Sequence, residues 1–260
     1  MRRMFITGDT HGRFNFLEPF CEEFNTTTED ILVILGDAGI NYYGCTSKKE
    51  EKLKKFIASQ PITLFCIRGN HEDRPEDRPE YTLKDMGIGD KVYQSLTYPN
   101  IWFAQDGGEY MICNQSILTV GGAYSVDKFF RIINGHKWVA NEMLTSDEIA
   151  QVLDTCYHKH YNHIMTHTCP ISVEPTDLFL RGIDQNTIPK DMERGLEMVA
   201  RYTTFDTWWF GHYHDNRVTA DKYHMLFDEI WEIQNGDSHY ISNQFTLNWK
   251  YERNHPECFF

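Results

Sequence analysis

The first part of the chain alternates short apolar runs with stretches in which apolar residues recur at helical spacing. The apolar runs cover residues 4–7, 31–35 and 62–67 and contain almost no polar interruption. Such continuous runs are typical of strands that are covered on both faces of a sheet. Residues 14–24 and 48–57, which lie between the runs, predict helices. This strand–helix order predicts a parallel sheet with right-handed crossovers.

The second part carries shorter apolar runs and one clear helix start. Several β-like runs within residues 100–123, and others at 163–166 and 207–210, predict further strands. Residues 145–148 read TSDE, which has the form of a capping box and predicts that a helix begins there. Between residues 245 and 251 every second position is apolar, which predicts a half-exposed antiparallel strand.

Residues 72–80 read EDRPEDRPE and interrupt the apolar pattern. Repeated proline excludes a helix interior or a central strand, so we predict an exposed loop. Whether this loop closes over a pocket is left open. No linker rich in Pro, Gly or Ser divides the sequence, and we therefore interpret residues 1–260 as a single domain.

Charge and cysteine content narrow the class of protein. The formal net charge is -13 and no Lys/Arg block is present, which argues against general nucleic-acid or membrane-surface binding. The seven cysteines form no C-x-x-C pair, so neither a disulfide framework nor a thiolate zinc site is expected. The N-terminal apolar run is too short for a signal peptide. We expect a cytoplasmic protein with reduced thiols and no membrane span.

Side chains that can bind metal follow the apolar runs at five places. They occur in GDTHG at residues 8–12, GD at 36–37, GNHE at 69–72, THTCP at 166–170 and GHYH at 211–214. In open α/β sheets, sites assemble outside the carboxyl ends of the strands. The five clusters are therefore expected to meet.

The candidate ligands share hard or borderline donor atoms and include no thiolate. They are Asp9, His11, Asp37, Asn70, His167, His212 and His214. This donor set is typical of a Mn, Fe or Zn site with oxygen and nitrogen ligands. It is not typical of a structural zinc site, whose ligands are Cys thiolates. Two cations roughly 3.5–4 Å apart need a shared anion between them, and such a pair can clamp a phosphoryl oxygen and acidify water.

Taken in order, these motifs resemble the signature of the calcineurin-like metallophosphoesterase superfamily, from Asp9 to His214. The resemblance implies an α/β fold, a four-layer α/β/β/α sandwich with two central mixed β-sheets. It also implies a catalytic role for His71. The ligands it implies are Asp9, His11 and His214 for a first cation, Asn70, His167 and His212 for a second, and Asp37 for both.

The implied activity is hydrolysis of a phosphate ester by attack of metal-bound hydroxide. The substrate class is open between a phosphomonoester, from a phosphoprotein or small molecule, and a phosphodiester, which could be a cyclic nucleotide, a dinucleoside polyphosphate or a nucleic acid. The acidic composition disfavours a processive nuclease. The alternative is a catalytically silent metal-binding scaffold or protein-interaction module on the same fold. All expected ligands are present, which favours the enzyme. The native metals, the physiological substrate and the oligomeric state are left open.

The second motif departs from the Ser/Thr protein phosphatase branch of this superfamily. In that branch the motif continues to an Asp that orients the catalytic His and an Arg that holds phosphate. Here Ile40 and Asn41 stand at those positions. Close kinship with protein phosphatases is therefore disfavoured, and the partner that orients His71 is left open.

Two other arginines are candidates to hold phosphate. The segment 121–131, GGAYSVDKFFR, resembles a segment of some bacterial and phage members of the superfamily. In it Asp127 and Arg131 are four residues apart, so they share one face if the segment is helical. Guanidinium matches phosphate bidentately, which makes Arg131 and Arg181 the candidate substrate-binding residues, with Asp127 as the neighbour of the first.

Overall fold

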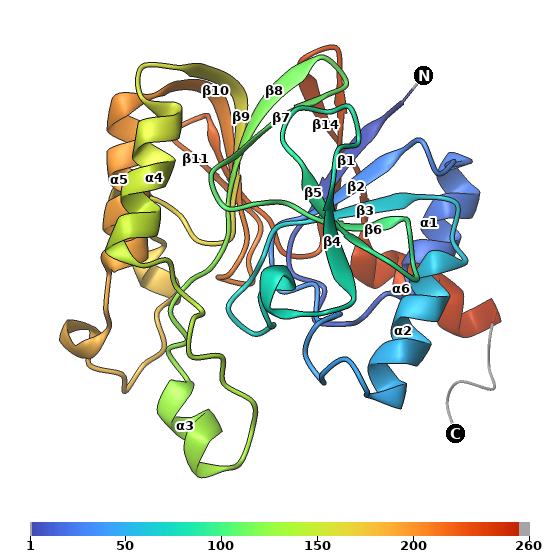
Figure 1. Ribbon diagram of the computed structural model, residues 1–260, viewed down its shortest axis with the longest axis horizontal. Coiled ribbons are helices and arrows are strands. Elements are labelled where there is room, and N and C mark those ends of the chain that lie inside the picture. Colours follow the sequence, from blue (N-terminus) through green and yellow to red (C-terminus); the bar gives the residue numbers. More distant parts are fainter. Residues whose placement is uncertain (1, 255–260) are drawn as a thin grey trace.

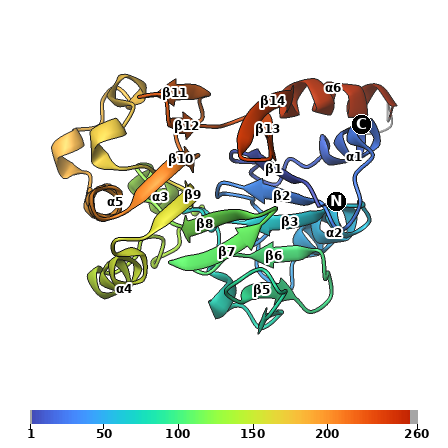
Figure 2. The same cartoon turned by 90° about the horizontal axis from the view of Figure 1, so that it is seen from above.

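Two β-sheets lie face to face between layers of helices in the computed structural model, which describes residues 2–254 (Figures 1 and 2). In spatial order the first sheet contains β14 (Asp237–Asn243), β13 (Glu229–Gln234), β1 (Met4–Thr7), β2 (Ile31–Ile34), β3 (Thr63–Cys66), β6 (Ile101–Phe103), β5 (Val92–Ser95) and β4 (Tyr81–Lys84). The second contains β11 (Arg217–Thr219), β12 (Tyr223–Met225), β10 (Thr204–Phe210), β9 (His160–Thr166), β8 (Gln115–Val120) and β7 (Gly108–Ile112).

Helices cover the outer face of each sheet. The first sheet carries α1 (Leu17–Phe24), α2 (Lys48–Ala58) and α6 (Gln244–Asn254), and the second carries α4 (Ser146–Cys156) and α5 (Asp191–Tyr202). A further helix, α3 (Lys128–Ile133), projects from the end of the molecule (Figure 1). Single 3₁₀ turns occur at Pro75–Asp77, Ile171–Val173, Thr176–Leu178 and Gln185–Thr187. The predicted four-layer α/β/β/α sandwich is confirmed.

The three apolar runs form the parallel centre of the first sheet. β1 pairs in parallel with β2, and β2 with β3, and every residue of the three strands is buried. Continuous burial explains why these runs show no polar alternation. The helix predicted at 48–57 is confirmed as α2, whereas the one predicted at 14–24 begins only at Leu17. The capping box at Thr145 is confirmed at the start of α4.

A single apolar core fills the space between the two sheets. Met4, Ile6 and Val33 of the first sheet belong to the same buried cluster as Met165 and Trp209 of the second. Packing of two inner faces against each other buries apolar area that neither sheet could cover alone. This shared core supports the interpretation of the chain as one domain, which stays a prediction. Within residues 2–254, no helix is both long and apolar enough to cross a membrane.

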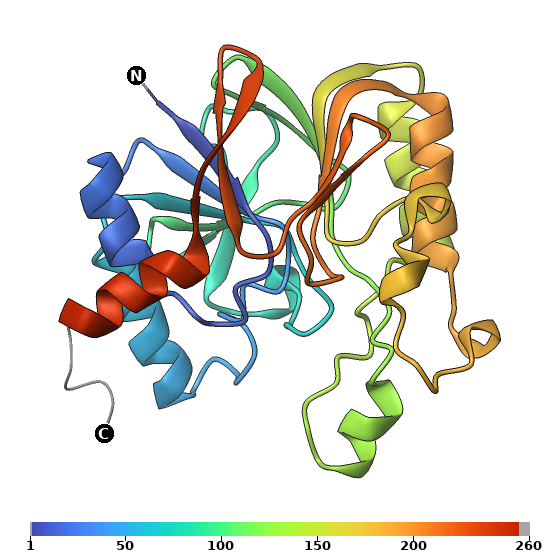
Figure 3. The same cartoon turned by 180° about the vertical axis from the view of Figure 1, so that it is seen from behind.

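The strand predicted between residues 245 and 251 is wrong, because this segment is helix α6. Leu247 is fully buried in the core that contains Phe20 of α1, whereas Phe245 is 75% and Trp249 58% exposed. A strand would place all three on one face, and their different burial excludes that arrangement. Figures 2 and 3 show α6 beside α1. The antiparallel pairing expected near the end is present one step earlier, between β13 and β14.

The prediction of an exposed loop at residues 72–80 is also wrong for its two arginines. Arg78 is buried and forms an ion pair with Glu50, while Arg74 is buried and lies 2.7 Å from Glu148 of α4. Buried charges occur where each one is paired. Charge and proline in the sequence do not distinguish a solvated loop from one that is fastened to the body by ion pairs.

Two buried histidines, on the two strands that flank β10, make stability depend on pH. His163 accepts a hydrogen bond from Trp209 at 3.2 Å, and His224 packs against the same indole, with ring centroids 4.3 Å apart. Burial lowers the pKa of His163 and of His224 to about 4. Both rings therefore stay neutral in the folded protein at a pH where the unfolded chain binds protons.

We predict that in His163→Asn the free energy of unfolding decreases less than in the wild type as the pH falls. Because the folded-state pKa lies below the ordinary value of 6.5, the unfolded state takes up more protons between pH 6.5 and about 4. The contribution of neutral His163 is thus complete above pH 6.5 and decreases as the pH falls through this window. Urea unfolding of metal-free protein at several pH values measures it. The prediction is contradicted if the free energy of unfolding differs between variant and wild type by the same amount at every pH in this window.

Candidate metal centre

The seven predicted ligands come from five loops that leave the carboxyl ends of strands. Asp9 and His11 follow β1, and Asp37 follows β2. The others are Asn70 after β3, His167 after β9, and His212 and His214 after β10. The two sheets face each other, so both contribute loops to the same place.

The first group of ligand atoms consists of Asp9, His11 and His214. His11 Nε2 lies 2.9 Å from His214 Nε2. Asp9 Oδ2 lies 3.3 Å from the same nitrogen of His214 and 3.8 Å from His11 Nε2. Three donor atoms therefore converge, as around a cation.

The second group surrounds His167, which is fully buried. Its Nε2 lies 2.8 Å from Asn70 Oδ1 and 3.7 Å from Asp37 Oδ2. Its Nδ1 contacts the backbone carbonyl of Leu35 at 2.8 Å, which fixes the ring orientation. The ring of His212 lies beside it, with centroids 5.0 Å apart.

Asp37 lies between the two groups. Its Oδ2 is 3.7 Å from His167 Nε2 and 3.9 Å from His11 Nδ1. Asp9 is close to both groups as well, because its carboxylate oxygen falls within 4.8 Å of ligand atoms of Asp37 and His167. Two carboxylates thus occupy the middle of the cluster, with imidazoles on either side.

The electrostatics of the cluster keep its carboxylates ionised and His212 neutral, whereas the contact with Asp9 raises the pKa of His214. Burial alone would raise the pKa of Asp37, but the surrounding His167, His71 and His11 outweigh it and the net pKa is lowered. Burial likewise opposes ionisation of Asp9, but His214 and its neighbours lower that pKa. Burial, with His167 nearby, lowers the pKa of His212 to about 3. The carboxylates are charged and His212 is neutral at pH 7, as metal ligands must be.

One atom of the cluster indicates directly that a cation fits. Asp9 Oδ2 is buried, and its 3.3 Å contact with His214 Nε2 does not make a well-formed hydrogen bond. A buried carboxylate oxygen without a donor is costly unless a positive charge compensates it. With oxygen and imidazole nitrogen as the donors, the residues fit divalent cations.

The backbone of these loops adopts conformations that are rare for residues with side chains. His11, Asp37, His212 and His214 have φ values of 48°, 46°, 70° and 54°. Such left-handed geometry persists only where the surrounding structure enforces it, and it is concentrated at functional sites. Gly69 permits the closest approach, because a Cβ there would lie 1.9 Å from Asp37 Oδ1.

Two supporting residues carry no recognisable sequence motif. The amide of Asn70 donates to Ser125 Oγ at 2.8 Å, and Ser125 in turn donates to Glu142 at 2.5 Å. Ser125 and Glu142 are buried. Because the serine accepts from the Asn70 nitrogen, the Asn70 oxygen points toward His167. The chain of contacts sets which end of the amide faces the cluster.

Glu72, the last residue of the GNHE motif, fastens two of the ligand loops to each other. Its Oε1 accepts from the backbone N–H of Ala38 at 3.2 Å and of Gly69 at 3.4 Å. Burial, together with the charge of Asp37, raises the pKa of Glu72 to about 8. This carboxyl group therefore supports the loops without adding a further negative charge to the cluster at pH 7.

The proposed catalytic His71 lies at the edge of the cluster. Its backbone N–H donates to Asp37 Oδ1 at 2.9 Å, and its Nε2 lies 3.9 Å from Asp37 Oδ2. Arg131 Nη2 lies 3.2 Å from His71 Nε2, and Arg131 is paired with Asp127 at 2.7 Å. Arg181, by contrast, is exposed and lines neither of the two cavities beside the cluster.

Ile40 and Asn41, which replace the expected Asp and Arg, point away from the cluster. Ile40 is buried in the core of the first sheet. Asn41 Oδ1 accepts from Lys54 at 3.0 Å and from the hydroxyl of Tyr81 at 2.8 Å. These positions therefore support the fold instead of orienting His71.

Comparison with known proteins identifies the family. The family model described as calcineurin-like phosphoesterase matches residues 2–216. The chain belongs to the calcineurin-like phosphoesterase family. Family membership and the cluster of possible ligands together support a metal-dependent phosphoester hydrolase. No curated protein matches the sequence in a direct comparison.

Two solved structures are similar to this chain at very low sequence identity, and the first of them shares its fold. The crystal structure of the protein TT1561 of Thermus thermophilus covers 94% of this chain and 99% of its own, with a TM-score of 0.50 and 9% identity. At this identity the likeness concerns the fold alone. A structure of a novel archaeal phosphodiesterase covers 92% of this chain and 98% of its own, with a TM-score of 0.34 and 8% identity.

We predict that Ser125→Ala weakens metal binding by this calcineurin-like phosphoesterase about 10–100-fold, the range typical of residues that orient a ligand. Without the serine oxygen, the Asn70 amide loses the contact that selects its orientation. Titration of the stripped protein with Mn²⁺ or Zn²⁺ against a competing chelator measures the affinity. Ser59→Ala, at a position outside the cluster, is the control. An affinity equal to that of the control contradicts the prediction.

Proposed function

We propose that the protein hydrolyses a phosphate ester with two cations held by the seven ligands. Asp9, His11 and His214 would hold one cation, and Asn70, His167 and His212 the other. Asp37 would be shared. The position of Asp37 Oδ2 between His11 Nδ1 and His167 Nε2, at 3.9 and 3.7 Å, carries this proposal.

When bound, a pair of such cations neutralises charge on the phosphate and makes a water molecule a competent nucleophile. The chain's own residues set the geometry. The left-handed loops, Gly69 and Glu72 hold the carboxylates in place before substrate arrives. Pre-organisation of this kind lowers the cost of reaching the transition state.

His71 is the candidate that transfers a proton to the leaving oxygen. It is accessible, with its side chain 21% exposed, and it lines both cavities beside the cluster. Burial lowers the pKa of His71, although the Asp37 charge opposes this. Arg131 can only donate hydrogen bonds, so its contact with His71 Nε2 orients the ring. Asp127 holds Arg131 through their ion pair. This pair would supply the orientation that Ile40 cannot.

The metals are proposed to be Mn, Fe or Zn, on the basis of the oxygen and imidazole donors. The substrate is proposed to be a phosphorylated small molecule, nucleotide or phosphoprotein. The net charge of -13 makes a long nucleic acid a poor substrate. A cytoplasmic location is part of the same proposal.

We predict that His71→Ala retains the metals but lowers kcat about 10²–10⁴-fold, the usual contribution of a positioned acid or base. The reason is that the His71 ring contacts the cluster from its edge, whereas the convergent donor atoms belong to other residues. Metal content by elemental analysis and turnover of an aryl phosphate ester measure the two effects separately.

His160→Ala is the matched control, because His160 is an exposed histidine at the start of β9. It should leave metal content and kcat unchanged. Loss of metal from His71→Ala would show that the assigned role is incorrect.

A further inference from the structure

Two cavities open on either side of His71, and they meet at the metal centre. One has a volume of about 260 Å³ and the other about 250 Å³. Asp37 and His71 line both. A phosphate held beside Asp37 therefore has space on two sides.

The first cavity has an apolar wall built by a single segment. The wall residues are Leu178, Phe179, Leu180, Ile183, Ile188 and Pro189. Leu180 is 56% exposed, and the other five are half-buried. Apolar side chains that remain accessible around a pocket indicate a surface that binds an apolar group.

The lysine of this cavity is already paired, and its buried glutamate, Glu193, has one oxygen without a partner among the described residues. Lys190 lies 2.6 Å from Glu174 and covers the ring of Phe179 at 4.6 Å. Glu193 accepts a hydrogen bond from Thr168 at 2.9 Å. The first cavity therefore offers no free positive charge to an anionic substituent, and its wall favours a ring or an alkyl chain.

The second cavity has a different character. It is lined by Tyr42 and Tyr43, whose rings lie 4.9 Å apart, and by Arg131. Lys49 lies over the Tyr43 ring at 4.2 Å, so the second cavity is more polar than the first and suits a flat or polar substituent. Arg131 reaches its inner end, beside His71.

The balance of charge also bears on the substrate. Of the residues that line the two cavities, only Lys190 and Arg131 carry a permanent positive charge, and each is paired with a carboxylate. A phosphomonoester carries about two negative charges at neutral pH, whereas a diester carries one. Apart from the bound cations, the described residues that line these cavities provide no unpaired positive charge. The second negative charge of a phosphomonoester would therefore have no partner among them.

We propose that the substrate is a phosphodiester, with an apolar substituent in the cavity walled by residues 178–189 and the other substituent beside Tyr42 and Tyr43. This inference rests on the proposed phosphoesterase function. Hydrolysis forms one bond between phosphorus and the oxygen of water and breaks one bond to an ester oxygen. One proton of the water goes to the departing alcohol and the other to the phosphomonoester product or the solvent.

Three substrates with one leaving group test this inference on the full-length, metal-loaded protein. They are 4-nitrophenyl phenyl phosphate, 4-nitrophenyl methyl phosphate and 4-nitrophenyl phosphate. We expect kcat/KM to be at least about tenfold higher for the phenyl diester than for the methyl diester, because only the phenyl ring fills the apolar cavity. The methyl diester should in turn exceed the monoester.

Ile188→Ser removes part of the apolar wall. It should lower kcat/KM for the phenyl diester about tenfold and leave the methyl diester within about twofold, so the methyl diester reports on folding of the variant. Leu96→Ser, at a residue that is 62% exposed and outside both cavities, is the matched control. An equal loss for both diesters would assign Ile188 a purely structural role and overturn the subsite.

A binding measurement gives an independent readout. Calorimetry on metal-free protein should show at least about tenfold tighter binding of diphenyl phosphate than of dimethyl phosphate, and equal affinities would overturn the apolar subsite. Faster turnover of the monoester than of either diester overturns the diester inference but leaves the phosphoesterase function intact. Turnover of none of the three esters by metal-loaded protein overturns both.

Discussion

Two carboxylates buried at the same point are the constraint on which the rest of this structure depends. Asp9 and Asp37 are 3% and 2% exposed, and both are ionised. Uncompensated, such charges would repel each other and oppose folding. Imidazoles from both sheets surround them, and a pair of cations would complete the neutralisation. The sandwich can be understood as a means of bringing loops from two sheets to these two side chains.

Holding those loops requires support that is spread through the fold. Glu72 joins the loop of Asp37 to the loop of Asn70, and Ser125 sets the orientation of the Asn70 amide. Neither residue needs to touch substrate. Both determine whether the ligands are in position before a cation binds, which is the usual function of residues surrounding a metal site.

Much of this arrangement was predictable from sequence because apolar runs end at the ligand motifs. The buried strands β1, β2 and β3 and the convergence of loops follow from that pattern. Helix α6 could not be predicted from that pattern. Alternate apolar residues can occur in a helix by chance when only Leu247 needs burial. The role of Glu142 could not be predicted either, because this residue lies far along the chain from the ligands and reaches them through Ser125. Contacts of this kind depend on tertiary packing, which leaves no local period.

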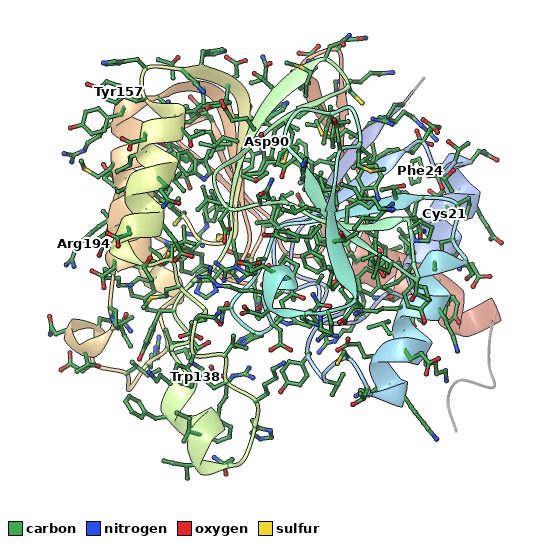
Figure 4. All side chains as sticks on the ribbon, in the orientation of Figure 1. Cys21, Phe24, Asp90, Trp138, Tyr157 and Arg194 are labelled. Atoms are coloured by element: carbon green, nitrogen blue, oxygen red, sulfur yellow. The ribbon has the colours of Figure 1, made fainter. Side chains whose placement is uncertain are left out.

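The segment that carries α3 has a consequence for how this enzyme could diversify. Asp127 and Arg131 lie at one end of it and Glu142 at the other, and between them it projects away from the sheets (Figures 1 and 3). Lys128 of α3 lies over the ring of Trp138 at 4.1 Å, and Figure 4 shows Trp138 next to this helix, within the same segment. None of the seven ligands belongs to it. Changes in α3 could therefore alter the surroundings of His71 through Arg131, whereas changes at Glu142, at the other end of the segment, would also disturb the orientation of the Asn70 ligand.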